Sequence, residues 1–222
     1  MLSGHGYKSE VFKEPGVFTS VGLLSYALVE LCFICLGEML MELCEENEVL
    51  RFWFEELTPS DWFKKSEELD ELVRERFGTT VRAALEGRLD SWSETAEGSL
   101  ALILLIDQFT RNIYRDTPQA FAGDAKALEI SLRCVELGFV EHEKMGYRHF
   151  MLIPMMHSED LEVQDRSLAL FEKYTEEKVL GFARRHRGVI ARFGRYPHRN
   201  RILGRDSTAE EIEFLKEPGS SF

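Results

Sequence analysis

A polar segment that follows a strongly apolar one is the first place in this sequence where chemistry could occur. Residues 100–106 are all apolar, and the chain then reads Asp-Gln-Phe-Thr-Arg-Asn-Ile-Tyr-Arg over residues 107–115. At 100° per residue, the polar side chains of this segment share one side of a helix. They are Asp107, Gln108, Arg111, Asn112 and Arg115. This ridge could line an internal cavity and orient a ligand. In the alternative interpretation, an i,i+4 pair of Asp107 and Arg111 only stabilises the helix.

A second candidate is the tripeptide His157-Ser158-Glu159. We expect Ser158 to cap the next helix, which would place His157 at a helix N-terminus, where backbone N–H groups attract anions. A histidine near a carboxylate can also transfer protons. The candidate catalytic residues are therefore His157, Glu159 and, further along the chain, His198.

The preceding segment Tyr-Arg-His-Phe, residues 147–150, adds Arg148 and His149 as candidate ligand contacts. A metal site would need a third ligand beside His157 and Glu159, and His149 or His198 would have to supply it. Because one histidine and one carboxylate are too few, we expect no metal site. Nothing in the sequence identifies a cofactor.

The third candidate is a basic segment. Residues 178–205 contain nine Lys and Arg residues and no Asp or Glu, although the whole chain has a net charge of −12. Arginine binds phosphate or carboxylate through two parallel hydrogen bonds, so this segment could hold an anion. Alternatively, its arginines are solvated and pair with acidic residues elsewhere. The loop over residues 192–201 supplies four more candidate ligand contacts, which are Arg195, His198, Arg199 and Asn200.

Together the clusters predict a pocket for a small anionic ligand or for the end of an acidic peptide. The anion would be clamped by Arg111, Arg195 and Arg199. It would be oriented by Asp107, Gln108 and Asn112. This prediction requires the clusters to converge in one cavity. If they do not, the protein is better explained as a scaffold that binds a protein partner and has no catalytic activity. We do not expect nucleic acid as a partner, because the negative net charge repels phosphate.

The elements that must position these residues are helices. Apolar residues recur at helical spacing from residue 46 onward, and no alternating strand pattern exceeds four residues. Residues 100–106 should form a central helix with neighbours on every side. Further helices are predicted over residues 49–57, 66–87, 118–138, 144–156 and 178–193, with others after Ser158 and Thr208. The fold class is therefore all-α, built of antiparallel helical hairpins.

Local signals define the ends and faces of several helices. Ser66 should cap a helix that turns Leu69, Leu72 and Val73 inward. Pro118, at the first position of another helix, should lead to an inward face that includes Ala125. A capping box, in which the cap and the third helical residue satisfy each other's backbone, is expected at the last helix. His186 falls on an apolar face, so we interpret it as a core histidine.

Residues 1–45 differ from the rest of the chain, and we expect them to lie outside the helical domain of residues 46–222. Residues 21–37 are apolar apart from Ser25, Tyr26 and Glu30. This run is just short of the roughly 20 residues that span a bilayer. We therefore expect a cytoplasmic protein, with a single-pass membrane anchor at residues 21–37 as the alternative.

Five motifs, taken in order, resemble the bacterial family called domain of unknown function 924. They are residues 49–54 (Val-Leu-Arg-Phe-Trp-Phe), 107–114, 156–159 (Met-His-Ser-Glu), 192–205 and the terminal Pro-Gly-Ser-Ser-Phe. The likeness covers residues 46–222, and it implies a TPR-like array of helical hairpins. Members of the family usually begin near the Phe-Trp-Phe motif, which agrees with an extension over residues 1–45. The resemblance implies no particular activity.

Overall fold

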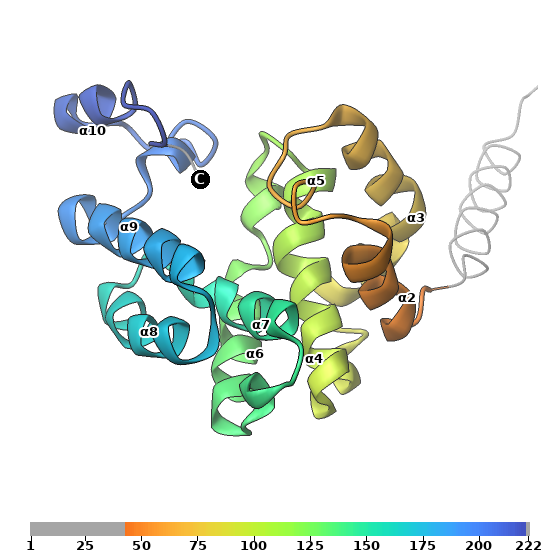
Figure 1. Ribbon diagram of the computed structural model, residues 1–222. Helices are drawn as coiled ribbons and strands as arrows, with labels where there is room; N and C mark the ends of the chain where they lie inside the picture. The colour runs from red at the N-terminus through yellow and green to blue at the C-terminus, as the bar shows by residue number, and fades with distance from the viewer. Residues whose placement is uncertain (1–42, 221–222) are drawn as a thin grey trace, which may run out of the picture. The chain divides into compact units, whose positions relative to one another are not determined.

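The computed structural model describes residues 43–220, and every regular element in that range is helical (Figure 1). The α-helices are α2 (Glu46–Arg51), α3 (Glu67–Leu85), α4 (Ala96–Ile103), α5 (Thr110–Ile113), α6 (Asp124–Glu136), α7 (Met145–His157), α8 (Leu161–Tyr174), α9 (Glu177–Phe193) and α10 (Ala209–Phe214). The predicted all-α class is confirmed for these residues. The proposed anchor at residues 21–37 lies outside the described residues. None of the described helices is long and apolar enough to cross a membrane.

Over residues 100–106 the central helix is buried on all sides, as its sequence predicted. It begins in α4, where the Thr95 side chain accepts a hydrogen bond from the backbone of Gly98, and continues through a π-helical turn, Leu104–Phe109, into α5. The apolar residues 100–106 are completely inaccessible to solvent. The π-helical turn also carries Asp107 and Gln108, and such turns are frequent at functional sites.

Successive helices after the central one pack against each other. α6 contacts α7, α7 contacts α8, and α8 contacts α9, while α7 also contacts α4 (Figure 1). The chain after α9 turns at Gly194, which has a positive φ of 68°, and forms a short 3-10 turn, Pro197–Arg199. This turn carries Arg199 to within 3.0 Å of Asp124 at the start of α6. Residues 75 positions apart in the chain thereby meet.

Two predicted caps are confirmed. The Ser66 hydroxyl accepts a hydrogen bond from the backbone N–H of Leu69 at 3.2 Å at the start of α3. At α10, Thr208 and Glu211 form the expected capping box. These caps depend on residues three positions apart, so the local sequence is sufficient to specify them.

The predicted start of α8 is wrong. Asp160 caps α8 by accepting hydrogen bonds from the backbones of Glu162 and Val163, whereas Ser158 ends α7. His157 is consequently the last residue of α7 and does not lie at a helix N-terminus. The expectation that His157 contributes to an anion site at a helix N-terminus is therefore wrong. Pro154 lies within α7, which continues for three residues beyond it.

Two predicted inward faces also need correction. Pro118 opens only a 3-10 turn, Pro118–Phe121, and α6 begins at Asp124. This break shifts the helical phase, so that Ala125 is exposed and Ala127 is buried instead. Leu72 of α3 is likewise exposed, at 40%. Gly123 allows α6 to start against the central helix, since a Cβ at this position would lie 2.1 Å from the Ile106 carbonyl oxygen.

Candidate functional site

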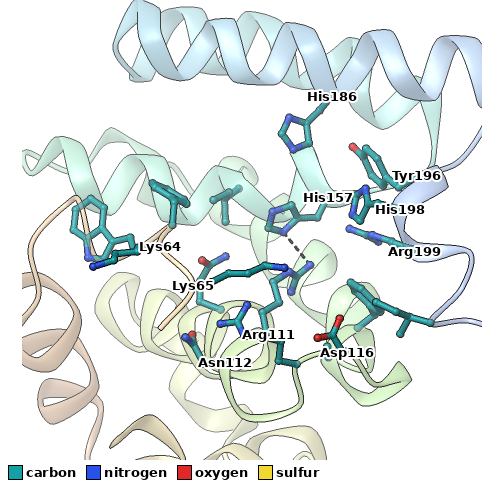
Figure 2. Close-up of a pocket in the computed structure, with 18 of the residues that line it drawn as sticks. Lys64, Lys65, Arg111, Asn112, Asp116, His157, His186, Tyr196, His198 and Arg199 are labelled. Carbon is teal, nitrogen blue, oxygen red and sulfur yellow. Dashed lines mark hydrogen bonds between the residues drawn. The ribbon is translucent and has the colours of Figure 1, made fainter. Parts of the chain in front are cut away.

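A cavity of about 500 Å³ opens between the central helix, the end of α7 and the chain after α9 (Figure 2). Six of the residues predicted to form a site line it, and they are Gln108, Arg111, Asn112, His157, His198 and Arg199. They come from three segments of the chain. The structure therefore brings together the polar ridge, the histidine at the end of α7 and the basic loop.

Asp107 lies directly behind the cavity wall and contacts His157. Its carboxylate is completely buried, and Oδ1 lies 2.8 Å from Nδ1 of His157. The Gln108 side-chain amide donates to the other carboxylate oxygen, and Arg111 makes the predicted i,i+4 ion pair at 3.2 Å. The carboxylate thus has a partner on each side. The predicted proton partner of His157 was Glu159, but the structure gives this place to Asp107.

The charge state of Asp107 follows from its surroundings. Burial alone would raise the pKa of this carboxyl group, since a charge is costly away from water. The positive charge of Arg111, followed by the charge and hydrogen bonds of its other neighbours, overcomes that cost and holds the pKa well below its usual range. Asp107 is therefore ionised and can only accept hydrogen bonds.

An ionised Asp107 determines which nitrogen of His157 carries the proton. Nδ1 of His157 lies 2.8 Å from Asp107 and 3.2 Å from Nη2 of Arg111. If Nδ1 were unprotonated, its lone pair would face the carboxylate at the shorter distance, which is repulsive. Nδ1–H therefore donates to Asp107, and the contact with Arg111 is secondary. This tautomer leaves Nε2 as the nitrogen that can act on a ligand.

Asp124 joins the two arginines of the cavity. Nη2 of Arg111 lies 3.0 Å from one oxygen of Asp124, and Nη1 of Arg199 lies 3.0 Å from the other. Both guanidinium groups also lie over the ring of Phe121, at 5.7 and 4.7 Å from its centre. One carboxylate and one aromatic ring thus hold two cations side by side.

Arg199 is unusual for an arginine because it is only 6% exposed. Burial lowers the pKa of its guanidinium, and the attraction of Asp124 only partly compensates. Its Nε has no hydrogen-bond partner among the described residues. A buried N–H without a partner is costly, so a ligand that accepts this hydrogen bond would stabilise the site.

The wall opposite the central helix contains His186, Tyr196 and His198. The Tyr196 hydroxyl donates to the carbonyl of Met156 at 2.5 Å and accepts from the amide of Gln164 at 2.8 Å. Burial, followed by the charge of Arg199, lowers the pKa of His198 to about 3, and burial lowers that of His186 to about 3 as well. Both are neutral at physiological pH, and His186 is buried as predicted.

Several residues of the cavity were not predicted from the sequence. Trp62, Phe63, Lys64 and Lys65 lie in the loop before α3, and both lysines are exposed without an ion pair to any described residue. The sequence signal for this part of the cavity was two adjacent aromatic residues followed by two lysines. It is a weak signal, because two neighbouring lysines in a loop are commonly just solvated. Asp124 gave no such signal, because its role depends on two arginines that are distant in the sequence.

The remaining predicted site residues do not line the cavity. Glu159 accepts hydrogen bonds from Arg205 and from the backbone of Tyr196 at 2.8 Å, so it braces the basic loop. Arg195 makes a two-bond ion pair with buried Glu211 at 2.7 and 2.8 Å. Asn200 is buried and bonds Ser207 and Arg205. Arg148 and His149 on α7 are half-buried, and the ring of His149 stacks on that of Phe150, but neither residue lines the cavity.

Most cations of residues 178–205 are paired. Seven of the nine make an ion pair with an acidic residue, and they are Arg184, Arg187, Arg192, Arg195, Arg199, Arg201 and Arg205. The alternative interpretation of this segment, charge pairing with an acidic body, therefore describes most of it. Of these seven, only Arg199 and Arg201 line the cavity. Among residues 43–220, no three His, Cys, Asp or Glu side chains are grouped as a metal site would require.

Comparison with known proteins places the chain in a family. The model of a family described as a bacterial protein of unknown function, DUF924, matches residues 49–219. The chain belongs to this family. A solved structure, that of the protein of unknown function ATU0120 from Agrobacterium tumefaciens, is similar to it with 36% sequence identity and a TM-score of 0.73. The match covers 77% of this chain and 96% of that one. A comparison with functionally curated proteins gave no match.

Membership of this family agrees with the helical structure of the chain, but it does not indicate which reaction or ligand the protein has. The evidence for function is therefore the cavity itself, in which two arginines and an Asp107-bound histidine meet.

Proposed function

We propose that the cavity binds a small anionic ligand or the carboxylate end of an acidic peptide. The observation that carries this proposal is the convergence of Arg111 and Arg199 on Asp124 within one cavity. Guanidinium groups held in this way are ordered before a ligand arrives, which lowers the entropic cost of binding. A phosphate or carboxylate would approach the side of this arginine pair that faces the cavity.

The other lining residues suit the same ligand. Lys64 and Lys65, which make no ion pair with any residue of the range 43–220, add two positive charges at the exposed edge of the cavity, where they would attract an anion. Gln108 and Asn112 place amide groups in the lining. A volume of about 500 Å³ is within the range of small-molecule sites. The cavity therefore has the size, the charge and the polar groups that a small anion needs.

A second candidate function is that of an interaction scaffold without catalytic activity. The extensive ion pairing of residues 178–205 favours it, since most of those arginines serve the fold. We also infer that the helices form a TPR-like array, because α6 to α9 each pack on the next, and that the protein is cytoplasmic. Such arrays present binding surfaces to partners.

Thermal unfolding with added anions tests the proposal. Inorganic phosphate and malonate, each compared with chloride at equal ionic strength, should raise the melting temperature by several degrees. Arg111→Gln should abolish this increase, and the double variant Lys64→Gln/Lys65→Gln should reduce it without disturbing the core. The control is Arg184→Gln/Arg185→Gln, which removes the same charge from an exposed part of α9. An increase that is equal in all variants, or absent in the wild type, would favour the scaffold.

A further inference from the structure

We propose that Asp107 and His157 make the cavity hydrolytic, with His157 removing a proton from a water molecule that attacks a bound phosphate ester. This inference rests on the proposed anion binding and adds a reaction and a substrate class to it. It is carried by the contact between Nδ1 of His157 and Oδ1 of Asp107 at 2.8 Å, made at the cavity wall.

The first step of the argument is the rigidity of Asp107. Its carboxylate is completely buried on a π-helical turn and is held by Gln108, Arg111 and His157 together. A carboxylate with partners on both oxygens cannot rotate away. Asp107 therefore holds the imidazole of His157 in one orientation, and it acts as a positioning residue because it does not reach the cavity.

The second step is the direction of the free nitrogen. Because Nδ1–H donates to Asp107, Nε2 of His157 keeps its lone pair, and it makes no hydrogen bond to any other residue in the range 43–220. Figure 2 shows His157 among the cavity residues, beside Arg111 and opposite His186. A negative carboxylate behind the ring also stabilises the imidazolium that forms when Nε2 takes up a proton.

The third step concerns the other histidines. His186 and His198 also line the cavity, but burial keeps both neutral, with pKa values of about 3. His157 instead has Nδ1 held 2.8 Å from the buried carboxylate of Asp107, and this contact equips the ring to take up a proton at Nε2.

The fourth step identifies the substrate class. Arg111, Arg199 and the lysines at Lys64 and Lys65 reach the cavity from three separate parts of the fold. The oxygens of a phosphoryl group are arranged tetrahedrally and can meet donors from several directions, whereas those of a carboxylate lie in one plane. Among residues 43–220, no Ser, Thr or Cys lines the cavity, so a water molecule is the nucleophile that the site favours.

The reaction balances with water as the only co-reactant. The water oxygen forms a bond to phosphorus while the ester P–O bond breaks. The water proton passes to Nε2 of His157 and then to the leaving oxygen. The products are inorganic phosphate and an alcohol, and the histidine returns to its initial state. Arg111 and Arg199 would stabilise the negative charge on the phosphoryl oxygens during the attack.

Hydrolysis of p-nitrophenyl phosphate by the full chain tests the inference, with phosphate binding measured on the same samples. The wild type should release p-nitrophenol, and His157→Gln should lose about 100-fold or more of that rate. Glutamine keeps the size and polarity of the side chain, so phosphate binding should persist. His142→Gln, which removes a histidine outside the cavity lining, is the control and should retain the full rate.

The role of Asp107 has its own readout. Nitrogen-15 chemical shifts of the wild type should show Nδ1 of His157 protonated and Nε2 unprotonated. Asp107→Asn should shift this balance and lower the rate. If this variant does not fold, the wild-type spectrum alone still decides the tautomer. Protonation of Nε2 rather than Nδ1 in the wild type would overturn the inference.

The outcomes separate this inference from the proposed function. A protein that binds phosphate but does not hydrolyse the ester, or one in which His157→Gln is as active as the wild type, overturns the hydrolytic role and leaves anion binding intact. A protein that shows neither binding nor hydrolysis overturns both.

Discussion

Arg199 and Asp124 lie 3.0 Å apart although 75 positions separate them in the chain. Their contact joins the loop after α9 to the first turn of α6, and it closes one side of the cavity. Because Asp124 also holds Arg111, a single carboxylate keeps two guanidinium groups together. The stability of this corner and its affinity for anions are therefore linked.

Asp124→Asn should weaken the fold and strengthen anion binding, because the amide oxygen can still order a guanidinium group but no longer neutralises its charge. Without the carboxylate, the free energy of unfolding should fall by about 1–3 kcal/mol, because two arginines lose a charged partner. Added phosphate can replace that partner, so it should stabilise the variant more than the wild type. Urea unfolding with and without phosphate measures both effects. Equal stabilisation of the two proteins would contradict the prediction.

Asp107→Ala should be among the more destabilising changes in the domain. It removes a completely buried carboxylate and leaves Arg111, His157 and Gln108 without their shared partner. Loss of one member of a buried charge network typically costs about 3–5 kcal/mol. Chemical denaturation gives the loss directly. A cost below about 1 kcal/mol would show that the network contributes little to the fold.

Arg195→Ala should lower stability without affecting the cavity. Its partner Glu211 is buried, and the hydrogen bonds from Arg195 are the main cause that lowers the pKa of this carboxyl group to about 2. Losing them should lower the free energy of unfolding, because a buried carboxylate is left without its charged partner. Phosphate binding should be unchanged, because Arg195 does not line the cavity. A weakened phosphate response in the folded variant would place Arg195 in the site after all.

Asp160→Ala and Ser158→Ala form a matched pair that tests the start of α8. Asp160→Ala should lower the free energy of unfolding by about 1 kcal/mol, since the Asp160 side chain caps two backbone N–H groups. The Ser158 hydroxyl accepts a single hydrogen bond, from the backbone N–H of Asp160, so Ser158→Ala should cost less. Thermal unfolding compares the two, and a larger loss for Ser158→Ala would restore it as the cap.

Stability should decrease as the pH falls below about 6.5, the ordinary pKa of histidine. His186 and His198 have native pKa values of about 3, so between 6.5 and 3 the unfolded chain binds protons that the native chain does not. Each histidine should contribute a slope approaching about 1.4 kcal/mol per pH unit. His186→Gln should remove one such contribution from unfolding free energies measured over pH 4 to 7. An unchanged slope would contradict the buried, neutral state of His186.

Short-range features of this protein could be predicted from its sequence. The caps at Ser66 and Thr208 and the ion pair of Asp107 with Arg111 depend on neighbours within a few positions. Helical geometry relates such neighbours directly, so their spacing was sufficient. The burial of residues 100–106 was predictable because every residue of that run is apolar, so no face of the helix could favour water.

The helical phase was less predictable where the backbone changes its winding. The 3-10 turn Pro118–Phe121 and the later start of α6 moved the buried face from Ala125 to Ala127. A continuous α-helical pattern cannot anticipate such a break. The start of α8 was not predictable for a different reason: Ser158 and Asp160 are both residue types that cap helices, and their spacing alone does not decide between them.

The sequence by itself determined which residue types were available for a site and on which helical stretches they lie. Only the tertiary structure decided their partners. It placed Asp107 against His157, Glu159 against Arg205 and Arg195 against Glu211. It also placed Lys64 and Lys65 at the edge of the cavity. The physical reason is that an ion pair or hydrogen bond between helices depends on how whole helices pack. That packing is settled by the entire core and not by the spacing of the residues that it brings together.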